Sequence, residues 1–317
     1  MDPLEEVLAL LGAAGHVSAA LVTGGRWALG FEPPTGVKFN AVRRGRCLLQ
    51  VEGEPDPVAL ETGDCFLLTR SQAFTLASHP GIPTEPAQPI FEAAVDGVAR
   101  AGEGDEVFLV GGAFSFTERA RALLLDSLPP VVHVPAATPE AETVRWAVAE
   151  IDVELRQAHP GARVVAEHLA LVMLIRILRL RLSQRAASGW LAGLADPVVA
   201  AALRAMHGRP SHPWTVAELA DAAAVSRSTL AARFKKVVGR GPLEYLTAWR
   251  IELAADRLRR GEDTVAAIAR MVGYGSESAL STAFKRTTGL SPRTYRSRAA
   301  RDASGGHGVA SRSVSDA

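Results

Sequence analysis

The sequence predicts an α+β protein with an N-terminal β-barrel or sandwich, a helical middle segment and a C-terminal all-α domain. Three observations support this fold class. Short apolar runs between turn residues fill the N-terminal third, two long amphipathic helices occupy the middle, and a pattern of helix, tight turn and helix occurs twice near the C-terminus. With 317 residues, 48% of them hydrophobic, the chain is long enough for two globular domains.

The N-terminal strands are predicted from short apolar runs at regular spacing. These runs are Trp27–Phe31, Lys38–Val42, Cys47–Val51, Val58–Leu60, Cys65–Leu68 and Phe74–Leu76. A closed β domain of this size encloses either a filled core or a small ligand cavity. The aromatic residues expected inside, and therefore the candidates for a pocket that holds a small apolar or aromatic ligand, are Trp27, Phe31, Phe39, Phe66 and Phe74.

Two helices are predicted in the middle of the chain, at 138–157 and 164–187, with His159-Pro160-Gly161 as the turn between them. The second helix carries apolar residues over more than one narrow stripe. This width favours burial against the β domain together with a self-complementary contact in a homodimer, and the alternative is complete burial within one chain.

Charge is distributed unevenly along the chain. Residues 1–130 carry 9 Lys and Arg against 17 Asp and Glu, whereas residues 209–301 carry 17 against 8. A basic module that meets a polyanion, joined to an acidic module with another task, is the simplest interpretation.

The basic segment contains an internal repeat with an offset of 50 residues. Eight residues of the first copy recur in the second, namely Ser226, Ser228, Leu230, Phe234, Lys235, Gly239, Pro242 and Tyr245, which match Ser276, Ser278, Leu280, Phe284, Lys285, Gly289, Pro292 and Tyr295. In each copy a Ser is the expected N-cap of the second helix and a Gly is its expected C-terminal stop. In the first copy, Thr215 and Glu218 form a capping box that opens the preceding helix.

Each copy therefore has the helix-turn-helix arrangement, whose second helix enters the major groove of DNA. A helix predicted over 243–260 separates the copies. About 18 residues span roughly 27 Å, so the two second helices could address major-groove faces about one turn of DNA apart. The alternative is a pair of ordinary αα-hairpins, which two copies on a basic segment make less favoured.

Residues 199–298 resemble the double helix-turn-helix domain of the AraC/XylS family of transcription regulators. The resemblance rests on Trp214-Thr-Val-Ala-Glu-Leu-Ala, Ser226-Arg-Ser-x-Leu-x-x-x-Phe-Lys, Gly239-x-x-Pro-x-x-Tyr-Leu, Trp249-Arg-Ile-x-x-Ala, Ile268-Ala-x-x-Val-Gly-Tyr, Ser276-Glu-Ser-Ala and Phe284-Lys-x-x-x-Gly-x-Ser-Pro-x-x-Tyr-Arg. It implies sequence-specific binding to double-stranded promoter DNA, usually with activation of transcription, for which RNA polymerase is a further expected partner.

Two sets of side chains are predicted to contact DNA. The base-reading candidates lie opposite the apolar stripe of each second helix: Arg227, Ser228, Ala231, Ala232, Glu277, Ser278, Ser281 and Thr282. The phosphate candidates are Lys235, Arg240, Arg250, Lys285, Arg286, Arg293 and Arg296. Family members often carry Arg where this chain has Ala232 and Thr282, so we expect readout to depend on small side chains, thymine methyl groups and DNA shape.

Residues 10–135 resemble the cupin-type ligand-binding domain that precedes many such DNA-binding domains. The resemblance rests on Leu60-Glu-Thr-Gly-Asp-Cys-Phe-Leu-Leu, on the run 107–116 and on Leu128-Pro-Pro-Val-Val-His. Many cupins bind a metal, but His16, His79 and His133 are not paired at ligand spacing. We therefore predict no catalytic residue, no metal and no cofactor.

The two cysteines, Cys47 and Cys65, are expected in adjacent strands. They are interpreted as buried thiols, with a redox-sensing pair as the alternative. The N-terminus has no basic region typical of a signal peptide, and no apolar run approaches the roughly 20 residues of a membrane span, so a cytoplasmic location without membrane contact is expected.

The predicted organisation is a cupin-like regulatory domain over 1–137, a helical dimerisation and linker segment over 138–198, a DNA-binding domain over 199–298 and a disordered tail over 299–317. The predicted function is a DNA-binding transcription regulator, an activator under control of a small-molecule effector. The alternatives are a cupin-type metalloenzyme with a helical C-terminal domain and an effector-independent DNA-binding protein.

Overall fold

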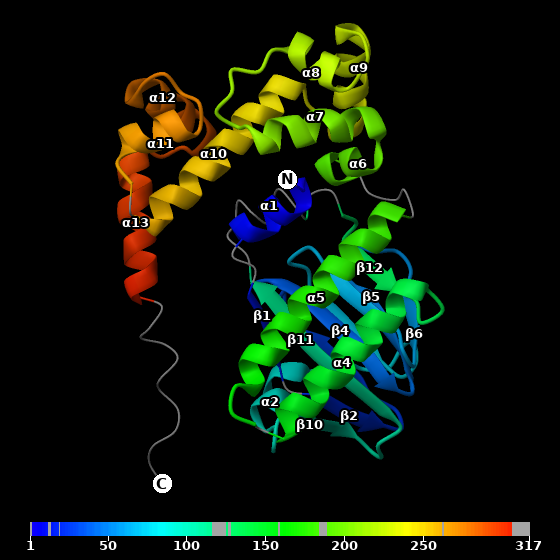
Figure 1. The fold of residues 1–317 in the computed structure, drawn as a ribbon. Helices are drawn as coiled ribbons and strands as arrows, with labels where there is room; N and C mark the ends of the chain where they lie inside the picture. The colour runs from blue at the N-terminus through cyan, green and yellow to red at the C-terminus, as the bar shows by residue number, and fades with distance from the viewer. Residues whose placement is uncertain are drawn as a thin grey trace. The chain divides into compact units, whose positions relative to one another are not determined.

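The computed structural model describes residues 2–11, 14–18, 20–115, 125, 128–157, 159–183, 189–261 and 263–305. The chain forms two compact units (Figure 1). One unit comprises residues 11–191, and the other combines residues 1–10 with residues 192–317. Each unit is described by itself below.

The first unit is built on two β-sheets. Its strands are β1 (Ala14–Val17), β2 (Ala20–Gly24), β3 (Ala28–Phe31), β4 (Val37–Arg44), β5 (Arg46–Val51), β6 (Val58–Glu61), β7 (Cys65–Leu68), β8 (Phe74–Ala77), β9 (Glu85–Pro86), β10 (Val98–Gly102), β11 (Val107–Ser115) and β12 (Val131–Val134). One sheet has the order β10-β2-β11-β4-β7-β12, with β1 also paired to β11, and the other has the order β6-β5-β8-β3-β9. The predicted strand runs are confirmed to within one or two residues.

The core of this unit lies between the two sheets. Leu21, Val42, Phe66, Leu68 and Leu109 of the larger sheet pack in one cluster with residues of the smaller sheet, Leu29, Leu49, Phe74 and Leu76 among them. Because side chains alternate along a strand, residues two apart share a face. On β4, therefore, Lys38, Asn40 and Val42 share the interior face, and Phe39 and Ala41 lie on the opposite face.

Helices cover that opposite face of the larger sheet (Figure 1). The helices α4 (Pro139–Gln157) and α5 (Ala162–Ser183) form an antiparallel pair, and the short helix α2 (Ala87–Glu92) lies near β10 and β3. Val144 and Val148 of α4 line one small space together with Ala41 and Cys65 of the sheet. With both faces covered, β7 is apolar and buried throughout, and β4 is buried over most of its length although it carries polar residues such as Lys38 and Asn40.

The second unit is helical. Its helices are α1 (Pro3–Leu11), most of which belongs here, α6 (Gly189–Ala195), which crosses the division at residues 191–192, and α7 (Pro197–Gly208), α8 (Val216–Ala222), α9 (Arg227–Val238), α10 (Pro242–Arg260), α11 (Val265–Met271), α12 (Glu277–Thr288) and α13 (Pro292–Gly305). The capping box of Thr215 and Glu218 is present, and Ser226 and Ser276 cap α9 and α12 as predicted. Gly239 and Gly289 end these helices at φ 85° and 75°, in the left-handed region where a side chain would be strained.

The repeat predicted from the sequence forms two helix-turn-helix motifs, α8–α9 and α11–α12 (Figure 1). Each has its own aromatic anchor, because Phe234 packs edge-to-face on Tyr245 and Phe284 packs edge-to-face on Tyr295. The helix α10 runs between the motifs and contributes buried residues to the core of each. These four aromatic residues are pairs related by the repeat, which explains why they are among its identities.

The N-terminal helix α1 packs on the second unit. Leu4 and Val7 are buried, and the Glu6 carboxylate lies 3.0 Å from Nδ1 of the fully buried His207. Nε2 of the same ring lies 2.8 Å from the hydroxyl of Tyr245. Burial lowers the pKa of His207 below its ordinary value although Glu6 opposes the shift. The ring is therefore neutral at pH 7, and Glu6 accepts a hydrogen bond from it.

The packing differs from the sequence-based ranges at both ends of the chain. The expected N-terminal regulatory domain began at residue 1, whereas α1 packs with the helical unit because its apolar face is buried there. The expected disordered tail began at residue 299, whereas α13 continues to Gly305. Residues 306–317 of that tail, like Phe116 of the run 107–116, lie outside the described residues.

Candidate functional site

The helices α9 and α12 present the predicted base-reading residues to solvent. Arg227, Ser228 and Ala232 on α9 are exposed, as are Glu277, Ser278 and Thr282 on α12, while Ala231 and Ser281 are half-buried. The opposite stripe of each helix is buried through Leu230 and Phe234, or Leu280 and Phe284. Each second helix therefore has one face fixed in its motif and one free face with small or charged side chains, as a helix that enters a DNA groove requires.

Five of the predicted phosphate contacts are exposed cations. They are Lys235, Arg240, Lys285, Arg286 and Arg293. Lys235 and Lys285 occupy the last turns of α9 and α12. Exposed cations of this kind are suited to phosphate oxygens, which position a protein on DNA without reading sequence.

Arg250 and Arg296 have internal roles instead. The half-buried Arg250 donates from Nε to the carbonyl of Pro210 and from Nη2 to the carbonyl of His212, each at 2.7 Å. Arg296 donates from Nη2 to the carbonyl of Asp263. Both guanidinium groups hold loops of their own unit in place, so the prediction of phosphate contacts is kept only for the five exposed cations.

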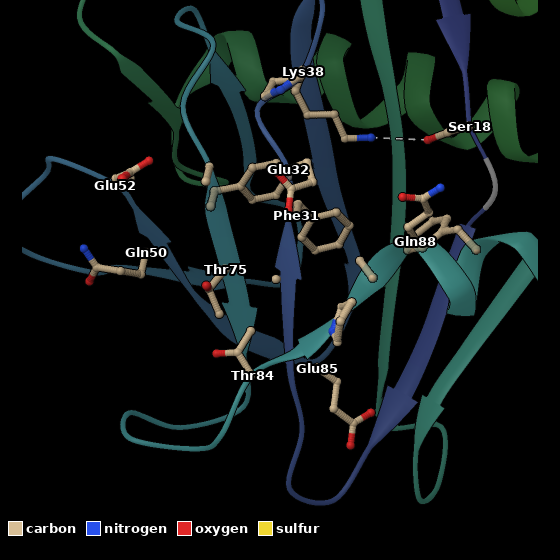
Figure 2. A pocket seen from close by; sticks show the side chains of 17 residues that line it. Ser18, Phe31, Glu32, Lys38, Gln50, Glu52, Thr75, Thr84, Glu85 and Gln88 are labelled. Carbon is tan, nitrogen blue, oxygen red and sulfur yellow. Dashed lines mark hydrogen bonds between the residues drawn. The ribbon is translucent and has the colours of Figure 1, made fainter.

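A cavity of about 690 Å³ opens in the first unit (Figure 2). Its apolar wall includes Phe31, Phe74 and Phe91. The rings of Phe31 and Phe74 are stacked with centroids 4.5 Å apart, and Phe91 meets Phe31 edge-to-face at 5.8 Å. Polar groups from several elements also line it, namely Ser18, Glu32, Lys38, Gln50, Glu52, Thr75, Thr84, Glu85 and Gln88.

Only part of the predicted aromatic lining belongs to this cavity. Phe31 and Phe74 line it as predicted. Phe39 and Phe66 are fully buried, Phe39 against Phe114 and Phe66 in the core between the sheets, so their assignment to a pocket was wrong. Trp27 lines a different space of about 650 Å³ together with His79 and Glu106.

Lys38 is a cavity residue that the sequence did not single out. Its Nζ lies 3.3 Å from the hydroxyl of Ser18. Burial lowers the pKa of Lys38 from 10.5 to about 8. The signal was available, because Lys38 is a charged residue that shares its strand face with the core residue Val42.

Comparison with known proteins shows two family matches. The cupin family matches residues 2–183, and a helix-turn-helix domain family matches residues 219–298. A protein of Streptomyces antibioticus described as an AraC-like transcription regulator is 62% identical over 93% of this chain and 98% of its own length. The chain belongs to the AraC-like transcription regulators. A Streptomyces lividans protein of the same description is 61% identical, and the regulator MtrA of Neisseria gonorrhoeae is 29% identical, each over the same shares of both chains.

Membership of the AraC-like regulators confirms the predicted fold class and the predicted helix-turn-helix DNA-binding domain. The relatives are described as transcription regulators rather than enzymes. Within the described residues, no group of three or more His, Cys, Asp or Glu side chains is arranged to hold a metal ion. No helix in the described ranges combines the length and apolar character needed to cross a bilayer.

The two cysteines of this AraC-like chain are buried free thiols. Their predicted placement in adjacent strands was wrong, because β5 pairs with β6 and β8 whereas β7 pairs with β4 and β12 in the other sheet. Burial, reinforced by the charge of Asp64, raises the pKa of both Cys47 and Cys65 to about 12. Each thiol is therefore protonated at neutral pH, which fits the interpretation as small apolar core residues.

We predict that Lys38→Met raises the free energy of unfolding at pH 7. The folded protein must keep a buried ammonium that the unfolded chain solvates freely, and the pKa falls from 10.5 to about 8 on folding. After allowance for partial exposure, the cost is about 2 kcal/mol. The cost shrinks as the pH rises above about 8 and vanishes above 10.5, where Lys38 is neutral in both states.

Urea denaturation of the full chain and the variant at pH 7 and at pH 10.5 measures this effect. Arg100→Met, an exposed cation on β10, is the control and should leave stability unchanged at both pH values. A variant that is no more stable than the parent chain at pH 7 would contradict the electrostatic cost assigned to Lys38.

Proposed function

We propose that this AraC-like regulator activates transcription as a homodimer whose DNA binding responds to a small-molecule effector. The observation that carries the proposal is the pair of free faces on α9 and α12, together with a cavity of about 690 Å³ in a separate unit. One unit contacts promoter DNA and the other binds the effector. A ligand that prefers one conformation of the first unit shifts the population in which the DNA-binding surfaces of a dimer match their half-sites. An activator of this kind also contacts RNA polymerase.

The two motifs are proposed to read different bases at equivalent positions. Arg227 and Glu277 are the first residues of α9 and α12, are related by the offset of 50, and are both exposed. Arginine donates to the two acceptors of guanine, whereas a glutamate accepts from the amino group of cytosine. The half-sites therefore differ, and the sequence of the DNA site has a direction.

Selection of binding sites from random DNA tests this reading. With Glu277→Ala, the preference for cytosine at one position of the second half-site should disappear, at a cost of about 1 to 3 kcal/mol for sites that carry it. Lys285→Ala is the matched comparison on the same helix. It should weaken binding to all sequences alike and reduce the salt dependence by about one counterion, because it removes a phosphate contact.

Loss of all base preferences in Glu277→Ala, or a loss confined to one base in Lys285→Ala, would contradict these assignments. Failure of the unmodified chain to enrich any sequence would contradict sequence-specific promoter binding.

The proposed dimer contact uses the helix pair α4 and α5. Trp146 and Val153 on α4 and Val165 and Val172 on α5 are apolar yet 38 to 53% exposed. On each helix the two residues are seven apart, which is the repeat that places side chains along the seam between packed helices. We infer that a second copy of the chain covers this seam in a two-fold contact.

We expect the double variant Trp146→Glu, Val172→Glu to sediment as a monomer at concentrations where the parent chain is a dimer, because two buried carboxylates per chain would face the partner. Val95→Glu replaces an apolar residue that is 71% exposed elsewhere in the same unit and should leave the dimer intact. Dimers that persist in the double variant would place the interface on another surface.

A further inference from the structure

Lys38 is a cation inside the first unit without a carboxylate partner in the structure described. It lies on the interior face of β4, and its Nζ has the hydroxyl of Ser18 at 3.3 Å as its hydrogen-bond partner. That hydroxyl itself donates to the carbonyl of Gly111 at 2.9 Å. Among the described residues, no carboxylate oxygen lies within 4.0 Å of Nζ. A neutral hydroxyl compensates a half-buried ammonium poorly, so among the described residues the charge of Lys38 has no counter-charge in contact with it.

The charge of Lys38 lowers the free energy of unfolding, and the fold does not need a charged residue at this position. A Met at this position would keep the length of the side chain and the apolar character of its stem, and the residues directly before and after it, Val37 and Phe39, are apolar. At pH 7 most Lys38 side chains still carry a proton, since burial lowers the pKa only to about 8. The cavity therefore offers a charged donor whose surroundings are less polar than bulk water, which strengthens its attraction for an anion.

The remainder of the cavity is suited to an apolar body with a flat face. The stacked rings of Phe31 and Phe74 and the edge of Phe91 provide an aromatic wall. Figure 2 shows Phe31 near the centre of the view and Lys38 near its top. Aromatic rings favour stacked or edge-to-face partners. A volume of about 690 Å³ lies within the range of sites for small organic molecules.

Carboxylates at the edge of the cavity limit how many negative charges a ligand can carry. Glu32, Glu52 and Glu85 line the cavity and are all exposed. Their negative charges repel a ligand with several anionic groups, such as a nucleotide or a sugar phosphate. A single carboxylate directed at Lys38 avoids most of this repulsion. An amine held by the glutamates is the competing possibility, but it would leave the ammonium of Lys38 uncompensated.

We propose that this cavity binds a small organic monocarboxylic acid, with its carboxylate on Nζ of Lys38 and the hydroxyl of Ser18 and its apolar or aromatic body against Phe31, Phe74 and Phe91. This assignment names the chemical class of the effector and so rests on the proposed function. The binding step itself involves no bond making or breaking. The charge-assisted hydrogen bond fixes the orientation, and burial of the apolar body contributes most of the affinity.

Calorimetric titration of the full chain at pH 7 tests the assignment with three isosteric probes. They are 2-naphthoate, the neutral 2-naphthamide and the cationic 2-naphthylmethylamine, and benzoate and decanoate serve as further acids of different shape. We expect an acid to bind once per chain, at least about tenfold more tightly than its neutral or cationic counterpart, because a hydrogen bond to a charged group contributes that much.

Two variants, one that removes a positive charge and one that removes a negative charge, distinguish binding of an acid from binding of an amine. Lys38→Met should weaken binding of the acid at least tenfold and make acid and amide equivalent, whereas Glu32→Gln should leave acid binding unchanged or tighter. Circular dichroism and thermal melting of each variant show that it is folded. Equal binding of acid and amide to the unmodified chain, preference for the amine with loss in Glu32→Gln, or no binding of any acid at 1 mM would each overturn the proposal.

A parallel measurement of DNA affinity keeps this proposal distinct from the proposed function. An acid that binds through Lys38 but leaves DNA affinity and transcription unchanged supports the ligand assignment and refutes effector control. A change in DNA affinity that persists in Lys38→Met locates effector control at another site and overturns this assignment.

Discussion

The packing of α10 into both helix-turn-helix motifs sets the distance between the two DNA-reading surfaces. Its first half places Tyr245 against Phe234 and Trp249 against His207, and its second half contributes Ile251, Ala254 and Leu258 to the core of the second motif. Because 19 residues of helix span about 28 Å, the motifs cannot approach or separate without breaking a buried contact. The offset of 50 residues between the two copies in the sequence therefore corresponds to a fixed distance between the two motifs in space.

The two units differ in how they accommodate charged side chains that turn inward. In the helical unit, the guanidinium group of Arg250 turns inward and donates hydrogen bonds to two backbone carbonyls. In the β unit, Lys38 remains only partly satisfied inside, and the fold tolerates it at the expense of stability. Such a cost is typical of a ligand site, where polar groups are arranged for a partner from outside the chain. The chain passes between the units twice, near residues 10–11 and 191–192.

Much of this architecture could be predicted from the sequence because it depends on local signals. Capping residues such as Ser226 and stop residues such as Gly289 fix helix ends through neighbouring atoms, and strand alternation fixes which residues face inward. What could not be predicted depends on partners distant in the sequence. The packing of α1 on the helical unit needs Glu6 to meet His207, and the roles of Arg250 and Phe39 depend on carbonyls and rings that the sequence does not place.

The cavity contains some residues that could be predicted from the sequence and others that could not. Phe31 and Phe74 were predicted as aromatic residues of strands in a small β domain, whereas Phe91 belongs to α2 and reaches the cavity only through the fold. The resemblance to the family could be predicted from motifs in the C-terminal third, because their characteristic residues are closely spaced in the sequence. The effector site is formed by scattered residues of the N-terminal unit, so its chemistry becomes visible only when the structure brings them together.

The most direct test of the account is the effect of spacing between the two half-sites. On a site selected by the full chain, insertion of 5 base pairs between the half-sites moves the second to the opposite face of DNA, beyond the reach of two readers fixed on α10. The account predicts that affinity falls to that of unrelated DNA, while the same 5 base pairs inserted outside both half-sites have no effect. Unchanged affinity after the internal insertion would show that the two motifs do not read DNA as one rigid pair.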